Sequence, residues 1–472
     1  MKKWRTAIFV SLALMMSSVF AYGNTGPVTW YQYPGISMIT IDEDTPVTVL
    51  KEDLHFDFSE EMENDYSLVG QVSAQYKMKN TGNEDIVSRM VFPFIKNLWS
   101  RDEDQIEVLL DGSPISYKIY YGENVKQTSV EDGFQETVEL EDILKSVTEE
   151  KYSPKNYEYE EKGTLYRIHL ESGQEEHMHV DASFTLSEHD SRIFVKGNNS
   201  YGYDNETNEF VIGTWLDHET RYMDIFSLDE ELKLDIRGYE NGTTDAVEVT
   251  DFTYEIEEIE MDVVTYYHDF LATDELIYSS VFIPEDKNIY YEVLDQALER
   301  ERLITGDHIS SLLASPRYVL IAYEVPFEAM EEKTVEVRYH TLGSMDKRET
   351  VEPTYTYEYF LHPAKYWKDF KDLTIRISPS ESYPYVVESN LDLKKEADGT
   401  YTGTFETLPE EDLSFTLYEK ETITTMEKIK GTVARNQYVL LFAGFAVLSV
   451  LAVVMLGLLI RKIIHLYRKT GK

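Results

Sequence analysis

The side chains best suited to chemistry lie in residues 165–186, where apolar and polar residues alternate. A strand with this pattern has one apolar face and one polar face. A three-residue loop at Glu171–Gly173 or Ser172–Gln174 would fold the segment into a hairpin. The polar face would then gather three imidazoles and two carboxylates, which belong to His169, His177, His179, Glu175 and Asp181.

This histidine patch has the donor atoms that a divalent metal ion needs. Residues two apart on a strand lie about 7 Å apart on one face, a span that two imidazoles can bridge around a metal. Arg167 projects into the same patch, however, and structural zinc typically needs four fixed ligands. We therefore interpret the patch as a solvated strand face and assign no metal-binding residue and no cofactor, with a bound divalent cation as the alternative.

Enzyme signatures are absent from the sequence. There is no Gly-x-Ser-x-Gly elbow, no His-Glu-x-x-His helix, no phosphate-binding glycine loop and no dinucleotide fingerprint. The chain has no cysteine, which excludes thiol enzymes. We name no catalytic residue and predict a protein that is not an enzyme. A glycosidase is the alternative, because two carboxylates suffice for it and the chain holds 87 acidic residues.

Turn signals between alternating runs predict antiparallel sheets. Asp111-Gly112, Asn241-Gly242 and Asp398-Gly399 each separate two such runs. These dipeptides readily adopt the positive φ that tight hairpins require. The predicted fold class is mostly β, with two antiparallel β-sandwich domains at residues 51–250 and 251–418 and one C-terminal transmembrane helix.

Residues 285–314 depart from the β-pattern. Their apolar positions fall at helical spacing and are Ile289, Val293, Leu294, Ala297 and Leu298. Asp286 or Asn288 could cap a helix there, and Gly306 could end it. We predict a helical insertion in the second domain, with its charged residues forming one solvated face.

The strand Val72–Met78 is followed by the sequence KNTGNED and then by a second strand that closes on Val91–Phe94. This arrangement resembles the opening β-sandwich of bacterial, Gram-positive-like, membrane-anchored surface proteins with immunoglobulin-like or VIT-like modules. The resemblance covers about residues 50–120. It implies a β-sandwich and no catalytic residues.

Two apolar segments indicate where the protein works. Ala7–Val19 follows basic residues and precedes Ala21, as in a signal peptide, so residues 1–21 are expected to be removed. Tyr438–Ile460 carries no charge and would be roughly 34 Å long as a helix, which matches a bilayer core of about 30 Å. We predict a transmembrane helix at residues 437–460.

The bounds of the remaining segments follow from the predicted signal peptide and transmembrane helix. Residues 22–50 form an N-terminal lead segment, and residues 419–436 form a juxtamembrane stalk. The tail, residues 461–472, carries only basic charges, which predicts a cytoplasmic C-terminus and an extracellular body.

The net charge of the chain limits the kinds of molecule that it can bind. The formal net charge is −43, which repels nucleic acids and other polyanions and favours basic partners or divalent cations. The absence of cysteine favours a bacterial envelope over an animal surface. We predict a single-pass protein of the cell membrane that binds or scaffolds an envelope protein or glycan. The alternative is an extracellular hydrolase that acts on envelope glycans with a carboxylate pair.

Overall fold

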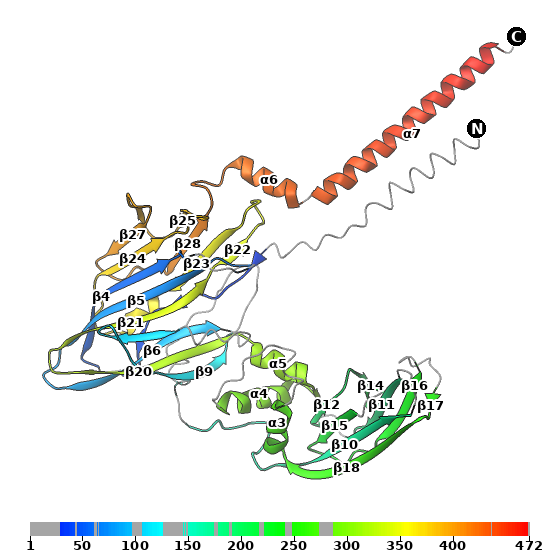
Figure 1. Ribbon diagram of the computed structural model, residues 1–472, viewed down its shortest axis with the longest axis horizontal. Coiled ribbons are helices and arrows are strands. Elements are labelled where there is room, and N and C mark those ends of the chain that lie inside the picture. The colour runs from blue at the N-terminus through cyan, green and yellow to red at the C-terminus, as the bar shows by residue number, and fades with distance from the viewer. Residues whose placement is uncertain are drawn as a thin grey trace.

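The structure is a computed structural model, and most of it is β-sheet (Figure 1). It describes residues 29–470 except 43–44, 61–63, 65, 97–105, 126–144, 146, 148–149, 174–177, 188–190, 217–220, 241–247, 273–286 and 436. Strands hold 49% of the residues and helices 18%, so the predicted β-rich class is confirmed. The predicted signal peptide, residues 1–21, lies outside the described residues.

The first and last parts of the chain form one unit, which we call the terminal unit (residues 29–125 and 315–418). Its largest sheet has the order β26 (Lys394–Lys395), β27 (Tyr401–Phe405), β24 (Leu373–Ser378), β4 (Val47–Asp57), β5 (Val69–Asn80), β21 (Glu332–Leu342), β7 (Glu107–Leu110), β8 (Ser113–Pro114). The second has the order β1 (Thr29–Trp30), β22 (Ser344–Asp346), β23 (Thr354–Phe360), β28 (Leu413–Tyr418), β25 (Tyr385–Ser389), with β2 (Gly35–Ile36) beside β23. The third has the order β3 (Ile39–Thr40), β6 (Ile86–Lys96), β20 (Arg317–Phe327), β9 (Lys118–Asn124).

The middle of the chain forms the inserted unit (residues 150–314), a sandwich of two sheets with helices packed at one end (Figure 1). One sheet has the order β18 (Phe252–Asp262), β10 (Lys162–Ser172), β15 (Arg221–Ser227), β12 (Ile193–Lys196), β19 (Leu303–Ile304). The other has the order β13 (Ser200–Asp204), β14 (Glu209–Leu216), β11 (Met178–Thr185), β16 (Asp235–Glu240), β17 (Glu248–Val249).

Strand pairing crosses the division predicted near residue 250. β5 pairs with β21, β6 pairs with β20 and β4 pairs with β24, so the strands before residue 125 complete their sheets with strands after residue 315. The predicted boundaries, 51–250 and 251–418, do not coincide with the sheets. Such pairing is set by long-range contacts, for which the sequence carries no local signal.

The predicted hairpin turns are confirmed where the structure describes them. Asp111 and Gly112 both have positive φ, 48° and 78°, between the paired strands β7 and β8. Gly399 has a φ of 92° between the paired strands β26 and β27. The third predicted turn, Asn241-Gly242, lies outside the described residues.

The predicted helical insertion contains two helices rather than one. α4 (Lys287–Arg300) is followed by the short strand β19 and then by α5 (Gly306–Ala314). Gly306 begins α5 instead of ending a helix, because the imidazole of His308 accepts a hydrogen bond from the Thr305 N–H and closes a capping box.

A further helix, α3 (Val263–Leu271), was not predicted from the sequence. Its β-branched and aromatic residues favour strands by local propensity. Asp262 caps it by accepting from the Thr265 N–H, and its rings pack on the outer side of the β10–β15 sheet, where Tyr266 stacks on Phe226 at 4.2 Å. Tertiary packing therefore overrides propensity here.

The chain ends in two helices, α6 (Thr425–Arg435) and α7 (Gln437–Thr470), and α7 extends away from the β-sheets (Figure 1). The predicted stalk, residues 419–436, contains α6. Within the described residues, no helix has both the length and the apolar character that crossing a membrane requires.

A buried cation lies where the inserted unit joins the terminal unit. Arg317 is fully buried at the start of β20, and its guanidinium lies 3.5 Å from a carboxylate oxygen of Glu292 on α4. It also donates long hydrogen bonds to the carbonyl oxygens of Leu312 and Gly122. Burial lowers the pKa of Arg317, and the Glu292 carboxylate opposes this effect. The ion pair thus connects α4 of the inserted unit to the sheet of the terminal unit that contains β20.

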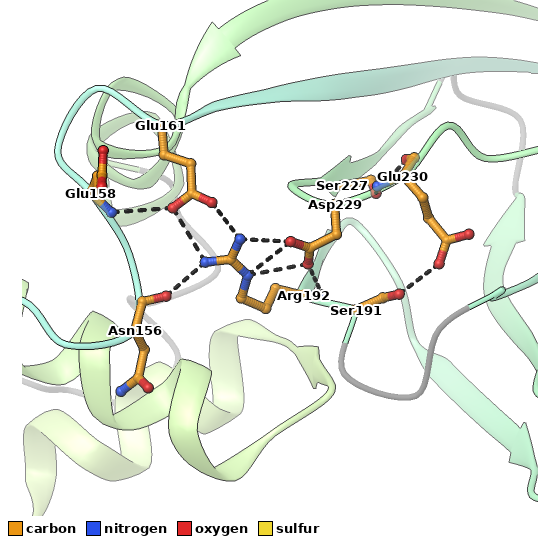
Figure 2. A network of polar contacts seen from close by, with 8 residues as sticks. All are labelled: Asn156, Glu158, Glu161, Ser191, Arg192, Ser227, Asp229 and Glu230. Atoms are coloured by element: carbon orange, nitrogen blue, oxygen red, sulfur yellow. Dashed lines mark hydrogen bonds and ion pairs between the residues drawn. The ribbon is translucent and has the colours of Figure 1, made fainter.

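A second polar network joins the loop before β10 to the start of β12 (Figure 2). The Arg192 guanidinium donates to the carboxylates of Glu161 and Asp229 and, at 2.6 Å, to the Asn156 carbonyl oxygen. On the other side of that loop, Asp295 of α4 accepts from the N–H of Asn156 at 2.7 Å. Burial lowers the pKa of Arg192, but the carboxylates of Asp229 and Glu161 outweigh burial and raise it. One chain of charge-assisted bonds therefore holds the helices to the sandwich.

The core of the terminal unit contains a buried acid. Glu52 is fully buried, and its β4 neighbours Leu54 and Phe56 point into the same core. Neither carboxyl oxygen has a partner with good hydrogen-bond geometry, although the hydroxyl of Tyr76 is near enough to lower the pKa in part. Burial is the larger effect and raises the pKa of Glu52 to about 8. The side chain is therefore mostly neutral at pH 7.

We predict that Arg192→Ala lowers the free energy of unfolding by about 2 kcal/mol, because the Glu161 and Asp229 carboxylates lose their shared cation. Urea unfolding of the purified chain measures this. Arg237→Ala is the matched control, since its pair with Asp235 is half exposed, and should change stability much less than Arg192→Ala does. Equal effects of the two substitutions would contradict a structural role for the Arg192 network.

We predict that Glu52→Gln makes stability less dependent on pH. The folded state holds a proton on Glu52 up to about pH 8, whereas the unfolded chain releases it near the ordinary glutamate pKa, so rising pH costs the native protein stability across this interval. The free energy of unfolding of Glu52→Gln, relative to that of wild type, should rise by at most roughly 1.4 kcal/mol per pH unit between about pH 5 and pH 8. Thermal unfolding across this range checks it, with exposed Glu84→Gln as the control. A constant difference between wild type and Glu52→Gln would show that Glu52 does not titrate in this way.

Candidate functional site

The predicted histidine patch does not form. β10 and β11 belong to different sheets and do not pair with each other, so they do not form a hairpin. The apolar faces were predicted correctly, because Tyr166 and Ile168 of β10 share one core with Met178 and Val180 of β11. The polar faces consequently point to opposite sides of the sandwich.

His169 and His179 are therefore not brought together. His169 lies on the outer face of one sheet and His179 on the outer face of the other. His177 lies outside the described residues. Among the described residues, no group of three or more histidine, aspartate and glutamate side chains is arranged to hold a metal ion.

The His169 side is a solvated strand face of the kind we expected. The His169 ring stacks on the half-exposed ring of Tyr222 at 4.8 Å. Beside it, Arg167 donates two hydrogen bonds of 2.9 Å to the carboxylate of Asp224, which raises the pKa of Arg167. The guanidinium of Arg167 and the carboxylate of Asp224 are thus paired with each other on this face.

The His179 side contains an arrangement that the sequence did not reveal. His179 Nδ1 lies 3.0 Å from Asp181 Oδ1, and His179 Nε2 lies 3.4 Å from Ser200 Oγ. The His179 residue is buried, whereas Ser200 is exposed. The imidazole thus lies between a carboxylate and a hydroxyl, with the hydroxyl at the surface. We call these three residues the Ser200 relay.

The register of the neighbouring strands β11, β14 and β13 brings the residues of the Ser200 relay together. Asp181 on β11 is opposite Gly213 on β14, and Gly213 is opposite Ser200 on β13, so the three residues form one row across the sheet. Residues in such a row point to the same face of a sheet. His179 is two residues before Asp181 and shares that face. Its ring can therefore reach from the carboxylate to the hydroxyl across the middle strand.

Gly213 provides the space in which the imidazole lies. A Cβ atom at this position would be 2.2 Å from His179 Cε1 and 2.5 Å from Ser200 Oγ, which is too close for either atom. The Trp215 ring meets the His179 ring edge to face at 5.0 Å and holds it from one side. Asn199 Oδ1 accepts from the Trp215 N–H at 2.5 Å and fixes the turn before Ser200.

This geometry favours proton transfer from Ser200. The carboxylate of Asp181 lies 3.0 Å from Nδ1, and in the tautomer with the proton on Nδ1 the other nitrogen, Nε2, is free to accept. An acceptor nitrogen beside a serine hydroxyl can remove its proton as the oxygen attacks an electrophile. A Ser–His separation of 3.4 Å falls in the range of unliganded sites, whose hydrogen bonds shorten when substrate binds.

Part of the Ser200 relay could be predicted from the sequence. Asp181 and His179 were both expected on one polar strand face, and they lie there. Ser200 was missed, because it comes from a strand two positions away in the sheet and no motif links it to the other two.

Comparisons with known proteins leave the function open. No family model matches the chain, and no curated protein matches it. A solved structure of a candidate nutrient binding protein from Legionella pneumophila is 9% identical and covers 86% of this chain and 76% of its own, with a TM-score of 0.34. A likeness this distant carries no argument about this protein.

We predict that Gly213→Ala lowers the free energy of unfolding by about 1–3 kcal/mol, because the added methyl group must displace the His179 ring or Ser200. Gly202→Ala is the matched control on the adjoining strand β13, since a Cβ atom there would contact nothing within 4 Å. Chemical unfolding of both variants checks this. If the two glycines tolerate alanine equally, the imidazole does not occupy the position described.

Proposed function

We propose that this chain is a single-pass membrane-anchored extracellular protein whose β-rich body binds or scaffolds another component of the cell envelope. The observation that carries the proposal is the uncharged stretch of sequence from Tyr438 to Ile460, which lies within α7. This helix runs without interruption for 34 residues and exposes large apolar side chains, among them Leu451, Leu456, Leu459 and Ile463. The uncharged stretch from Tyr438 to Ile460 would be roughly 34 Å long as a helix, which matches a bilayer core of about 30 Å.

Orientation follows from charge. Arg461 and the basic residues after it favour a cytoplasmic end for α7, which leaves the sheets outside. The apolar N-terminal segment, residues 7–19, supports export of the body. The resemblance to membrane-anchored surface proteins of Gram-positive-like bacteria is consistent with this placement.

A binding role is supported by the edge strand β18. It pairs with β10 along its whole length, and no other described strand pairs with its outer edge. It carries the exposed acids Glu255, Glu257, Glu258 and Glu260. Acidic residues discourage random pairing of such an edge, but they favour a basic segment in extended conformation. A basic envelope protein is therefore the partner that this surface suits.

The second candidate function is an extracellular hydrolase that acts on envelope glycans. The observation that favours hydrolysis is the Ser200 relay rather than a pair of carboxylates. A glycosidase needs two carboxyl groups facing one glycosidic bond. The relay holds one carboxylate with an imidazole and a hydroxyl, which suits acyl transfer instead.

We predict that protease added to intact cells digests the body but spares an epitope placed after residue 472. The reason is that a bilayer around α7 would shield the cytoplasmic tail. Immunoblotting with antibodies to the body and to the epitope reads the result, and permeabilised cells, where the epitope must be digested, are the control.

A chain that ends at residue 436 is the matched variant. It should leave the membrane fraction and appear in soluble form outside the cytoplasm, because it lacks α7. Protection of the body in intact cells, or a membrane fraction that retains the shortened chain, would contradict the proposed anchor.

A further inference from the structure

We propose that Ser200 is a nucleophile that accepts acyl groups from esters, with His179 as its general base and Asp181 as the residue that orients the base. This activity goes beyond the binding role proposed above and does not depend on the membrane anchor. It rests on the contacts of the Ser200 relay and on the room that Gly213 leaves for the imidazole.

The exposure of the three side chains suits this division of roles. Ser200 is exposed and can meet a substrate. The side chains of His179 and Asp181 are 11% and 17% exposed, so water screens their contact only weakly. A carboxylate on Nδ1 also stabilises the imidazolium that forms when Nε2 takes a proton. The base is therefore oriented before any substrate arrives.

The reaction balances with an ester and water alone. Ser200 Oγ attacks the carbonyl carbon while its proton passes to His179 Nε2, and the carbonyl π electrons move to oxygen. As the tetrahedral intermediate collapses, the ester C–O bond breaks and the alcohol leaves with the proton from Nε2. Water then attacks the acyl-serine, giving its proton to Nε2, and the carboxylic acid leaves as that proton returns to Ser200 Oγ.

The surroundings of Ser200 define the substrate class. The relay lies on an outer sheet face, at the edge strand β13, so a short acyl group on an accessible alcohol fits better than a long chain that needs burial. The formal net charge of −43 disfavours anionic substrates. Neutral or cationic short-chain esters, such as acetyl esters, are therefore the expected substrates.

Covalent labelling tests the nucleophile directly. The full chain in detergent is incubated with a fluorophosphonate probe, and the adduct is located by peptide mass spectrometry. We expect one adduct per chain, at Ser200, and none in Ser200→Ala. Ser187→Ala is the matched control, because Ser187 is also exposed in the inserted unit and its described hydrogen bonds use only its backbone N–H. This variant should label like wild type.

The rate of labelling tests the roles of the other two residues. His179→Gln should slow labelling by at least about 100-fold, the contribution that a positioned general base makes. Asp181→Asn should slow it less, because the imidazole remains. Thermal unfolding of each variant verifies that it is folded, and hydrolysis of p-nitrophenyl acetate should fall in the same order.

Three outcomes would overturn the proposal. They are a folded wild-type chain that takes no label, a label on a different residue, and a folded His179→Gln variant that labels as fast as wild type. None of these outcomes bears on whether α7 anchors the chain, because labelling is measured on purified protein.

Discussion

The apolar core between the two sheets of the inserted unit is the constraint on which the candidate site depends. Because β10 and β11 bury their apolar faces in the same core, their polar faces must point in opposite directions. This separates His169 from His179 and gives each a different set of neighbours. His169 meets Tyr222, whereas His179 meets Asp181 and Ser200. One rule of sheet packing thus separates His169 from His179 and places His179 beside Asp181 and Ser200.

Charged side chains connect the parts of the molecule that the cores keep apart. Arg192 links the loop before β10 to β12, and Asp295 continues that link to α4. Arg317 and Glu292 repeat the arrangement where the helices meet β20. A fully buried charge such as Arg317 is costly unless it is paired, and the pairs in both networks restrain the relative position of the elements that supply their members. Glu52 differs, because burial keeps it neutral instead of pairing it with a cation.

The candidate site depends on space that a glycine leaves on the sheet. A sheet normally fills its outer face with side chains, yet Gly213 leaves one position empty in the row between Asp181 and Ser200. The imidazole lies over that position and touches both neighbours. The strong acidity of the chain surrounds this neutral hydroxyl with a field that favours uncharged or cationic ligands. The acidic edge strand β18 favours basic ligands for the same reason, so the two surfaces are suited to related partners.

The sequence by itself determined the β-rich class, the turns at Asp111-Gly112 and Asp398-Gly399, and the apolar faces of β10 and β11, because each depends on alternation or on φ preferences of a few neighbouring residues. It also placed helix in residues 285–314, although β19 divides that region. Only the tertiary structure decided that β5 pairs with β21, that α3 is a helix and that Ser200 faces His179. These features arise from contacts between residues far apart in the chain, whose energies no local pattern records.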